Sequence, residues 1–497
     1  MTSAPRSPRP QAASRAARFL LVSLSASLLL AACSGYSSGP APSAPGPVAS
    51  MSPTPPSPDP RVGLKAGWMD AGQAIWNLRL VAAVPPSEHF YSPTTPGDRR
   101  LTNSDLAFTR NFVIQGNYSG HQIWDVTNPA RPTLKVAYVC PGSQSDVSVY
   151  KNLLFVSGES TSGRLDCGVQ GVPDSVSHDR LRGIRIFDLT DVTNPKYLAN
   201  VQTCRGSHTH TVVTDPNDAA NVYIYVSGSA PVRSPQELPG CSGAPLDEDP
   251  NTALFRIEVI QVPLANPSNA RIVSSPRIFQ GLAAPPRHAE LPADVAAAAA
   301  RRRAAGEPPE DPAAAARRRG GPTQCHDITV YPTIGLAGGA CGGYGLLLDI
   351  KDVANPRRIG AVADSNFSFW HSATFSNDGS KILFTDEWGG GSQPRCRATD
   401  KYEWGANAIF TLENREMTFQ SYYKLPAPQT PLENCVAHNG SLIPIPGRDV
   451  MIQGWYQGGI SVFDWTDPNN VMEIAFHDRG PVDSTRMQMG GSWSVYW

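Results

Sequence analysis

The stretch Ile123-Trp124-Asp125-Val126-Thr127-Asn128-Pro129 recurs along the chain as a hydrophobic run ending in Asp, a short polar stretch, Asn-Pro and a second hydrophobic run. Further copies begin at Ile186, Leu348 and Val462, and a copy without the Asp begins at Val259. A short Asp side chain can bond the local backbone while Pro fixes φ and ends a strand, so each copy predicts a hairpin corner. Repetition of such a unit predicts a propeller or a solenoid.

Short runs rich in Val, Ile, Tyr and Phe flank the corners and predict four strands per unit. We therefore expect an all-β, seven-bladed β-propeller over residues 75–497. Residues 77–81 are expected to join the seventh blade as its outermost strand, with residues 493–496 as its innermost strand, so that both ends of the chain close the ring and no long edge stays free. That blade would lack its second and third strands. The expected inner strands begin near Ser104, Ser145, His208, Cys325, His371, Ala437 and Ser492.

The first 32 residues carry four arginines, an apolar run and small residues before Cys33, which is typical of a secretory signal peptide. The pattern resembles that of bacterial lipoproteins, which implies lipidation of Cys33 and cleavage before it. Ser34 resembles the residue found in lipoproteins sent to an outer membrane or cell surface. Residues 33–61 are rich in Pro, Ser and Gly and predict a disordered tether.

The composition is ordinary for a globular protein, with 40% hydrophobic residues and a net charge of -1. It offers no basic patch for nucleic acid. Residues 283–321 form an insertion rich in Ala and Arg, which we expect to be exposed and partly helical. A basic contact with anionic lipid or polysaccharide is the alternative for this segment.

Nine cysteines are present. With Cys33 assigned to lipid, eight remain, an even number that favours disulfides in an exported chain. Most lie where an inner strand starts and the next strand ends, points that share one end of an antiparallel blade. The expected pairs are Cys140 with Cys167, Cys204 with Cys241, Cys325 with Cys341, and Cys396 with Cys435 across adjacent blades.

Four successive blades carry histidine at the start of the inner strand, and these starts converge on one mouth of a propeller channel. Neutral imidazole is a good ligand for copper, iron or zinc, and such a cluster could activate water or dioxygen. Asp105 and Asp146 occupy similar places in the first two blades, and Asp386 and Glu387 add carboxylates nearby. Structural hydrogen bonding around a wet channel is the competing interpretation. The candidate metal ligands are His210, His326, His371 and His438.

The remaining histidines lie off this mouth, and we expect them at the surface or in turns. They are His89, His121, His178, His288 and His477.

The corner phrase, together with four further stretches, resembles the LVIVD-repeat family of exported bacterial and archaeal β-propellers. The resemblance covers residues 75 to 497 and implies a propeller fold and a surface location more than a reaction. The stretches are Cys325-His326-Asp327-Ile328-Thr329-Val330-Tyr331-Pro332, Trp370-His371-Ser372-Ala373-Thr374-Phe375, Phe384-Thr385-Asp386-Glu387-Trp388-Gly389-Gly390-Gly391 and Gly458-Gly459-Ile460-Ser461-Val462-Phe463-Asp464.

These features predict a lipid-anchored, extracytoplasmic surface protein that binds a protein, small-molecule or polysaccharide ligand through its His-lined channel mouth. One alternative is a metal-dependent oxidoreductase or hydrolase, in which Asp386 or Glu387 either accepts a proton or supports a metal ligand by a hydrogen bond. The other is a structural scaffold that would tolerate loss of the four histidines.

Overall fold

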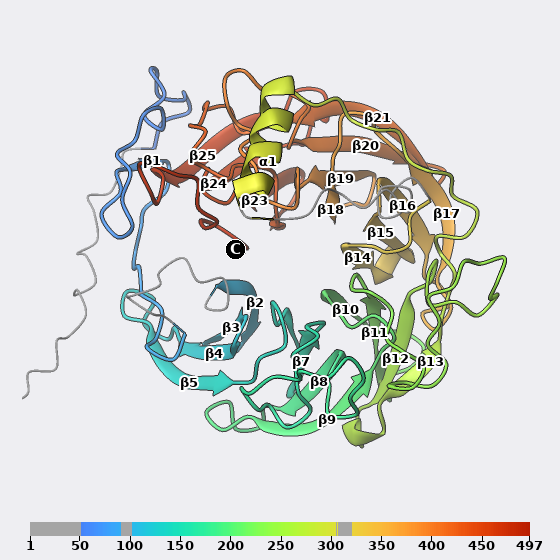
Figure 1. The fold of residues 1–497 in the computed structure, drawn as a ribbon. Coiled ribbons are helices and arrows are strands. Elements are labelled where there is room, and N and C mark those ends of the chain that lie inside the picture. Colours follow the sequence, from blue (N-terminus) through green and yellow to red (C-terminus); the bar gives the residue numbers. More distant parts are fainter. Residues whose placement is uncertain (1–50, 91–101, 305, 307–320) are drawn as a thin grey trace, which may run out of the picture. The chain divides into compact units, whose positions relative to one another are not determined.

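The computed structural model describes residues 51–90, 102–304, 306 and 321–497. The strands in these residues form six antiparallel sheets, which stand as blades around a central axis (Figure 1). The prediction of an all-β propeller is confirmed, but the predicted number of blades is wrong. Six blades are found, not seven.

Each blade runs outward from its inner strand in chain order. The first three blades are β2 (Asn103–Thr109), β3 (Phe112–Asn117), β4 (Gly120–Asp125) and β5 (Thr133–Val139); β6 (Val147–Tyr150), β7 (Leu153–Gly158), β8 (Gly183–Asp188) and β9 (Lys196–Gln202); and β10 (Thr209–Val213), β11 (Asn221–Ser227), β12 (Glu258–Pro263) and β13 (Arg271–Ser274). The last three are β14 (Asp327–Tyr331), β15 (Leu336–Cys341), β16 (Tyr344–Asp349) and β17 (Arg357–Val362); β18 (Trp370–Phe375), β19 (Lys381–Asp386), β20 (Asn407–Glu413) and β21 (Glu416–Tyr423); and β22 (Gly440–Ile445), β23 (Arg448–Gly454), β24 (Ile460–Asp464) and β25 (Met472–Arg479).

The expected seventh blade is replaced by two separate features. The N-terminal strand β1 (Gln73–Trp76) pairs with β25 and so adds a fifth, outer strand to the sixth blade. It ends at Trp76 because Asn77 has a left-handed backbone (φ 54°) and turns its side-chain amide to the carbonyl of Ile474. Residues 77–81 therefore do not form the expected strand.

Residues 492–496 follow the inner strand of the sixth blade without forming a ladder with it. The Ser441 hydroxyl donates to the Val495 carbonyl over 3.0 Å, and Tyr496 donates to Asp105 of the first blade over 2.7 Å. Adjacent inner strands pack from β2 through β6, β10, β14 and β18 to β22. Residues 492–496 thus join the sixth blade to the first largely through side chains.

The hairpin corners form as the repeated phrase predicts. Asp125 accepts a hydrogen bond from the backbone N–H of Thr127 over 2.9 Å, and Asp188 and Asp464 make the same contact with Thr190 and Thr466. In every blade a β-bulge between the third and fourth strands lies shortly before the corner. The Asp therefore closes a local turn, which is a structural role.

The four predicted disulfides are confirmed: Cys140–Cys167, Cys204–Cys241, Cys325–Cys341 and Cys396–Cys435. The first three tie neighbouring segments of one blade, and the fourth links the loop after β19 to the approach to β22. Cys33 and the signal sequence lie outside the described residues.

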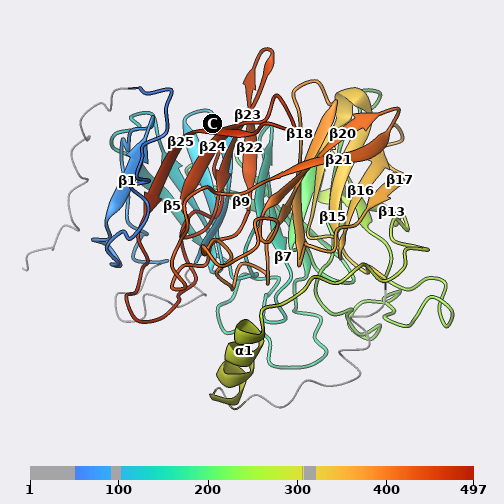
Figure 2. The same ribbon diagram turned by 90° about the horizontal axis from the view of Figure 1, so that it is seen from above.

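Residues 51–61, at the end of the predicted tether, run beside the outer part of the sixth blade. The Arg61 guanidinium is buried, makes two hydrogen bonds to Glu473 and lies 3.8 Å from the centroid of the Phe476 ring. The Ala/Arg-rich insertion contains helix α1 (Pro292–Ala304), which projects beyond one end of the blades (Figure 2). Within the described ranges, no helix has the length and apolar character to cross a membrane.

Candidate metal centre at the channel mouth

Four histidines from successive blades form a continuous arc at the channel mouth. Neighbouring ring centroids lie 4.5, 3.9 and 4.2 Å apart along the arc. We call these residues the histidine arc: His208, His326, His371 and His438.

Local backbone structure positions His326 and His371 in the arc. His326 follows the disulfide-bonded Cys325, and its N–H continues the ladder to the carbonyl of Ala340 over 2.8 Å. His371 lies in a bulge of β18 between Trp370 and Ala373. A bulge re-aims side chains, and this one directs His371 toward its neighbours in the arc.

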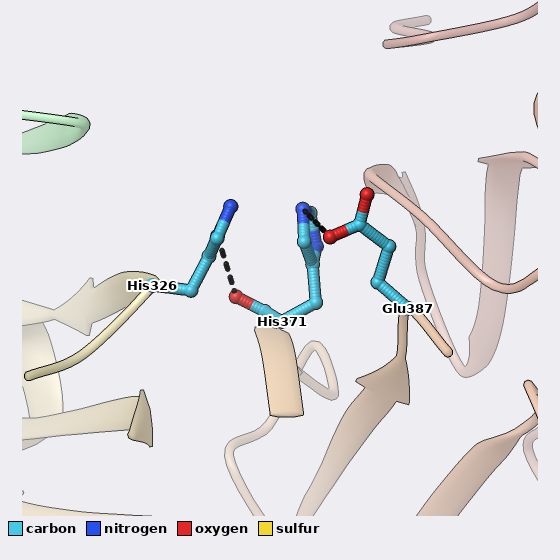
Figure 3. A group of neighbouring side chains, drawn as sticks. All are labelled: His326, His371 and Glu387. Carbon is cyan, nitrogen blue, oxygen red and sulfur yellow. Dashed lines mark hydrogen bonds and ion pairs between the residues drawn. The ribbon is translucent and has the colours of Figure 1, made fainter. Parts of the chain in front are cut away.

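Glu387 follows β19 and brings a buried carboxylate to the arc (Figure 3). Its Oε2 atom lies 3.8 Å from Nε2 of His371, and Oε1 lies 3.7 Å from Nε2 of His438. The hydroxyl of Tyr456 donates to Oε1 over 2.5 Å. Side-chain ligand atoms of His326, His371 and Glu387 all lie within 4.8 Å of one another, a spacing that one metal ion could bridge.

The imidazoles of His326, His371 and His438 are neutral at physiological pH. Burial lowers the pKa of His326 and His371 well below its usual range, and the neighbouring histidines lower it further. Burial also lowers the pKa of His438 to about 3. Neutral imidazole is the form that binds metal, so the environment favours ligation.

In two of these rings, hydrogen bonds leave Nε2 as the nitrogen that can bind a metal ion. Nδ1 of His326 donates to the carbonyl of His371 over 3.1 Å, and Nδ1 of His438 donates to the carbonyl of Trp493 over 2.6 Å. Each Nε2 atom is then left with its lone pair. In His371, Nδ1 is buried and has no hydrogen-bond partner in the described part of the chain.

The arc includes three of the four predicted ligands, but His210 is not among them. Its Nδ1 atom lies 3.0 Å from Asp146 and 2.8 Å from the Ser157 hydroxyl, so it serves a polar cluster in the channel wall. His208, and not His210, occupies the third-blade position in the arc. It directly precedes β10 as His326 directly precedes β14, and this shared register could have identified it from the sequence.

Asp386 points away from the arc. Its carboxylate accepts backbone N–H groups of Ser368, Phe369 and Gly405 over 2.8–3.0 Å. Burial raises its pKa to about 7 despite these bonds. Of the two predicted carboxylates, Glu387 faces the histidines and Asp386 holds adjacent loops together.

The arc opens on a channel cavity of about 300 Å³, which His326, His371 and His438 line together with carboxylates. Burial, followed by the charge of Asp146, raises the pKa of Asp105 well above its usual range and that of Asp327 to about 6. The cavity wall thus combines neutral imidazoles with carboxyl groups that hold protons readily.

A larger groove of about 730 Å³ lies on the rim, between the end of the third blade and the corner of the fourth. It is lined by residues of both charges, among them Arg277, Lys351 and Asp352, and by no histidine within the described ranges. Of the convergent metal-ligating residues, His326 and His371 line the smaller cavity, which we therefore take as the candidate site.

No protein-family model and no curated protein matches the chain. Solved structures with similar folds include the periplasmic gluconolactonase of Pseudomonas aeruginosa, with TM-score 0.44, 13% identity, and 76% of this chain and 84% of that chain covered. A protein from Lactobacillus plantarum has TM-score 0.43 at 12% identity, with 76% and 81% covered. The hydrazine synthase of Kuenenia stuttgartiensis has TM-score 0.41 at 10% identity, with 78% and 87% covered. Likenesses at this level carry no argument about the activity of this chain.

The four disulfides indicate an extracytoplasmic protein, because such bonds persist in oxidising compartments.

Proposed function

We propose that the protein is an extracytoplasmic β-propeller that binds copper, iron or zinc at the channel mouth through His326, His371 and Glu387. The observation that carries this proposal is the convergence of ligand atoms from these three residues within 4.8 Å. The neutral imidazoles and the buried carboxylate suit a divalent transition metal.

The metal would supply Lewis-acid or redox chemistry to a small molecule in the channel, which makes a metal-dependent hydrolase or oxidoreductase the function class. Tyr456 orients the carboxylate of Glu387 through its hydroxyl. His438 flanks the same carboxylate and lines the cavity. The cavity of about 300 Å³ also suits binding of a small polar ligand without chemistry, which is the second candidate function.

The N-terminal sequence supports a further part of the proposal, attachment to a membrane through lipid on Cys33. The repeated corner phrase supports membership of the LVIVD-repeat family. Labelling of growing cells with radioactive palmitate tests the anchor: label is expected in the wild type and not in Cys33→Ser. Equal labelling of both proteins would contradict it.

The metal site is tested by elemental mass spectrometry of disulfide-intact protein that begins at Ser34 and carries no His-tag. We expect near-stoichiometric copper, iron or zinc in the wild type and its loss in a His326→Ala, His371→Ala double variant. His178→Ala, at an exposed position, is the matched control and should keep the metal. A wild type that is metal-free and takes up no added metal would overturn the proposal.

The metal also separates the two enzyme classes. A Cu(II) or Fe(III) paramagnetic resonance signal that ascorbate abolishes would favour an oxidoreductase. Zinc, which has no redox chemistry, would favour a hydrolase.

A further inference from the structure

Glu159 and His208 form a close pair at the third-blade end of the histidine arc. Oε1 of Glu159 lies 2.5 Å from Nδ1 of His208, and the side chains are only 14% and 16% exposed. The other carboxylate oxygen accepts a hydrogen bond from the Ser229 hydroxyl over 2.6 Å. The carboxylate is therefore held from both sides, and it accepts the Nδ1 proton of the ring.

Two contacts concern the opposite nitrogen of His208. The side-chain amide nitrogen of Gln144 lies 2.6 Å from Nε2 and 3.1 Å from Nδ1 of the same ring. Nε2 of His326 lies 2.9 Å from Nε2 of His208. Because the Nδ1 proton of His326 goes to the carbonyl of His371, the Nε2 atom of His326 carries a lone pair that can accept a proton or bind a metal ion.

Two imidazole Nε2 atoms therefore face each other at 2.9 Å. Without metal, one proton can bridge them in a hydrogen bond, and a bound metal ion would displace that proton. Two nitrogens bound about 2.0–2.1 Å from one ion lie about 2.9 Å apart at right angles and about 3.3–3.4 Å apart at the tetrahedral angle, so a small outward shift of the rings would make them ligands of a shared zinc ion. A carboxylate that accepts the remote N–H of a ligating imidazole fixes the ring and raises its basicity.

We propose that His208 is a further ligand of the metal centre and that Glu159 is its positioning residue. This inference rests on the proposed function, because it requires metal at the arc. It extends the ligand set to the third blade. It also gives Glu159, which has no sequence motif around it, a defined role.

The test uses the full exported chain from Ser34, loaded with zinc. Zinc-edge X-ray absorption counts the coordinated imidazoles, and competition with a chelator gives the Kd. We expect His208→Ala to lose one imidazole. We expect Glu159→Gln to keep metal but to bind it 10- to 100-fold more weakly, since loss of such a partner typically has that effect. Glu248→Gln and His178→Ala, both at exposed positions, are matched controls and should resemble the wild type.

The results distinguish failure of the roles assigned to His208 and Glu159 from failure of the proposed metal site. Zinc-loaded wild type with an unchanged imidazole count in His208→Ala would overturn the ligand assignment. An unchanged Kd in Glu159→Gln would overturn the positioning role. If His208→Ala does not fold, His208→Gln is measured in the same way. A wild type that takes up no zinc would instead overturn the proposed function itself.

Discussion

His121 is expected to make the fold sensitive to acid. It lies in β4 and is 1% exposed, its ring stacks on Tyr138 with centroids 5.0 Å apart, and it meets Phe187 edge-on. Its Nε2 atom has no hydrogen-bond partner in the described part of the chain. Burial, together with the nearby Arg185 guanidinium, lowers its pKa to about 3.

The sign of the effect follows from linkage. The unfolded chain takes up the His121 proton near pH 6.5 and the folded chain only near pH 3, so the free energy of unfolding falls as the pH drops through this window. The loss is about 1.4 kcal/mol per pH unit. Between pH 7 and pH 4.5 this amounts to about 2–3 kcal/mol from His121 alone.

The perturbation is His121→Phe, which keeps a stacked ring and removes the titration. Urea unfolding followed by tryptophan fluorescence gives the free energy of unfolding of both proteins at pH 7 and pH 4.5. The variant should lose about 2–3 kcal/mol less than the wild type over this interval. A difference in packing energy that is the same at both pH values cancels, because the free energy of unfolding of each protein at pH 4.5 is subtracted from its own value at pH 7. Equal acid losses in the two proteins would refute the reasoning.

Asp386→Asn should lower the free energy of unfolding by about 1–3 kcal/mol, because its amide group would face the buried N–H of Gly405 without accepting it; urea unfolding at pH 7 measures this, and an unchanged midpoint would contradict it. Arg61→Ala should cost about 3–5 kcal/mol by leaving the buried carboxylate of Glu473 without its cation; thermal unfolding that matches the wild type would show that the N-terminal segment does not brace the sixth blade. Protein that begins at Ser34, denatured without reductant, should take up no iodoacetamide, and after reduction it should gain eight alkyl groups by mass; any uptake before reduction would argue against complete pairing.

The repeated corners and the cysteine spacing were predictable because both depend on local geometry. An Asp that closes a turn bonds the backbone two residues on, and this requirement is visible in any single copy of the phrase. Disulfide partners followed from their position at matching ends of adjacent strands. Counting blades was different, because it depends on which backbone groups pair. Residues 492–496 carry a strand-like sequence, yet in the described part of the chain their backbone forms only one isolated bridge, between Ser492 and Tyr456, and their other bonds to the sixth blade involve side chains.

The candidate site was predictable in its residue types and only partly in its members. His210 lies in β10 and contacts Asp146, whereas His208 lies just before the strand and contacts His326. Strand alternation would place residues two apart on the same face, so the local pattern could not separate these two histidines. Glu159 follows β7 and reaches the arc from the second blade, so no local pattern marks it. His121 was expected at the surface, but its ring is enclosed by aromatic side chains from neighbouring strands.

The segment 492–496 contacts both the histidine arc and the junction between the last and first blades. Its Trp493 carbonyl holds Nδ1 of His438, while its Tyr496 hydroxyl holds Asp105 across the junction of the last and first blades. Any ligand that favours the ordered arrangement of His438 must, by thermodynamic reciprocity, also favour the closed junction. A ligand bound at the channel mouth would then stabilise closure of the propeller ring. Its binding would slow hydrogen exchange of the backbone amides beside the junction of the last and first blades.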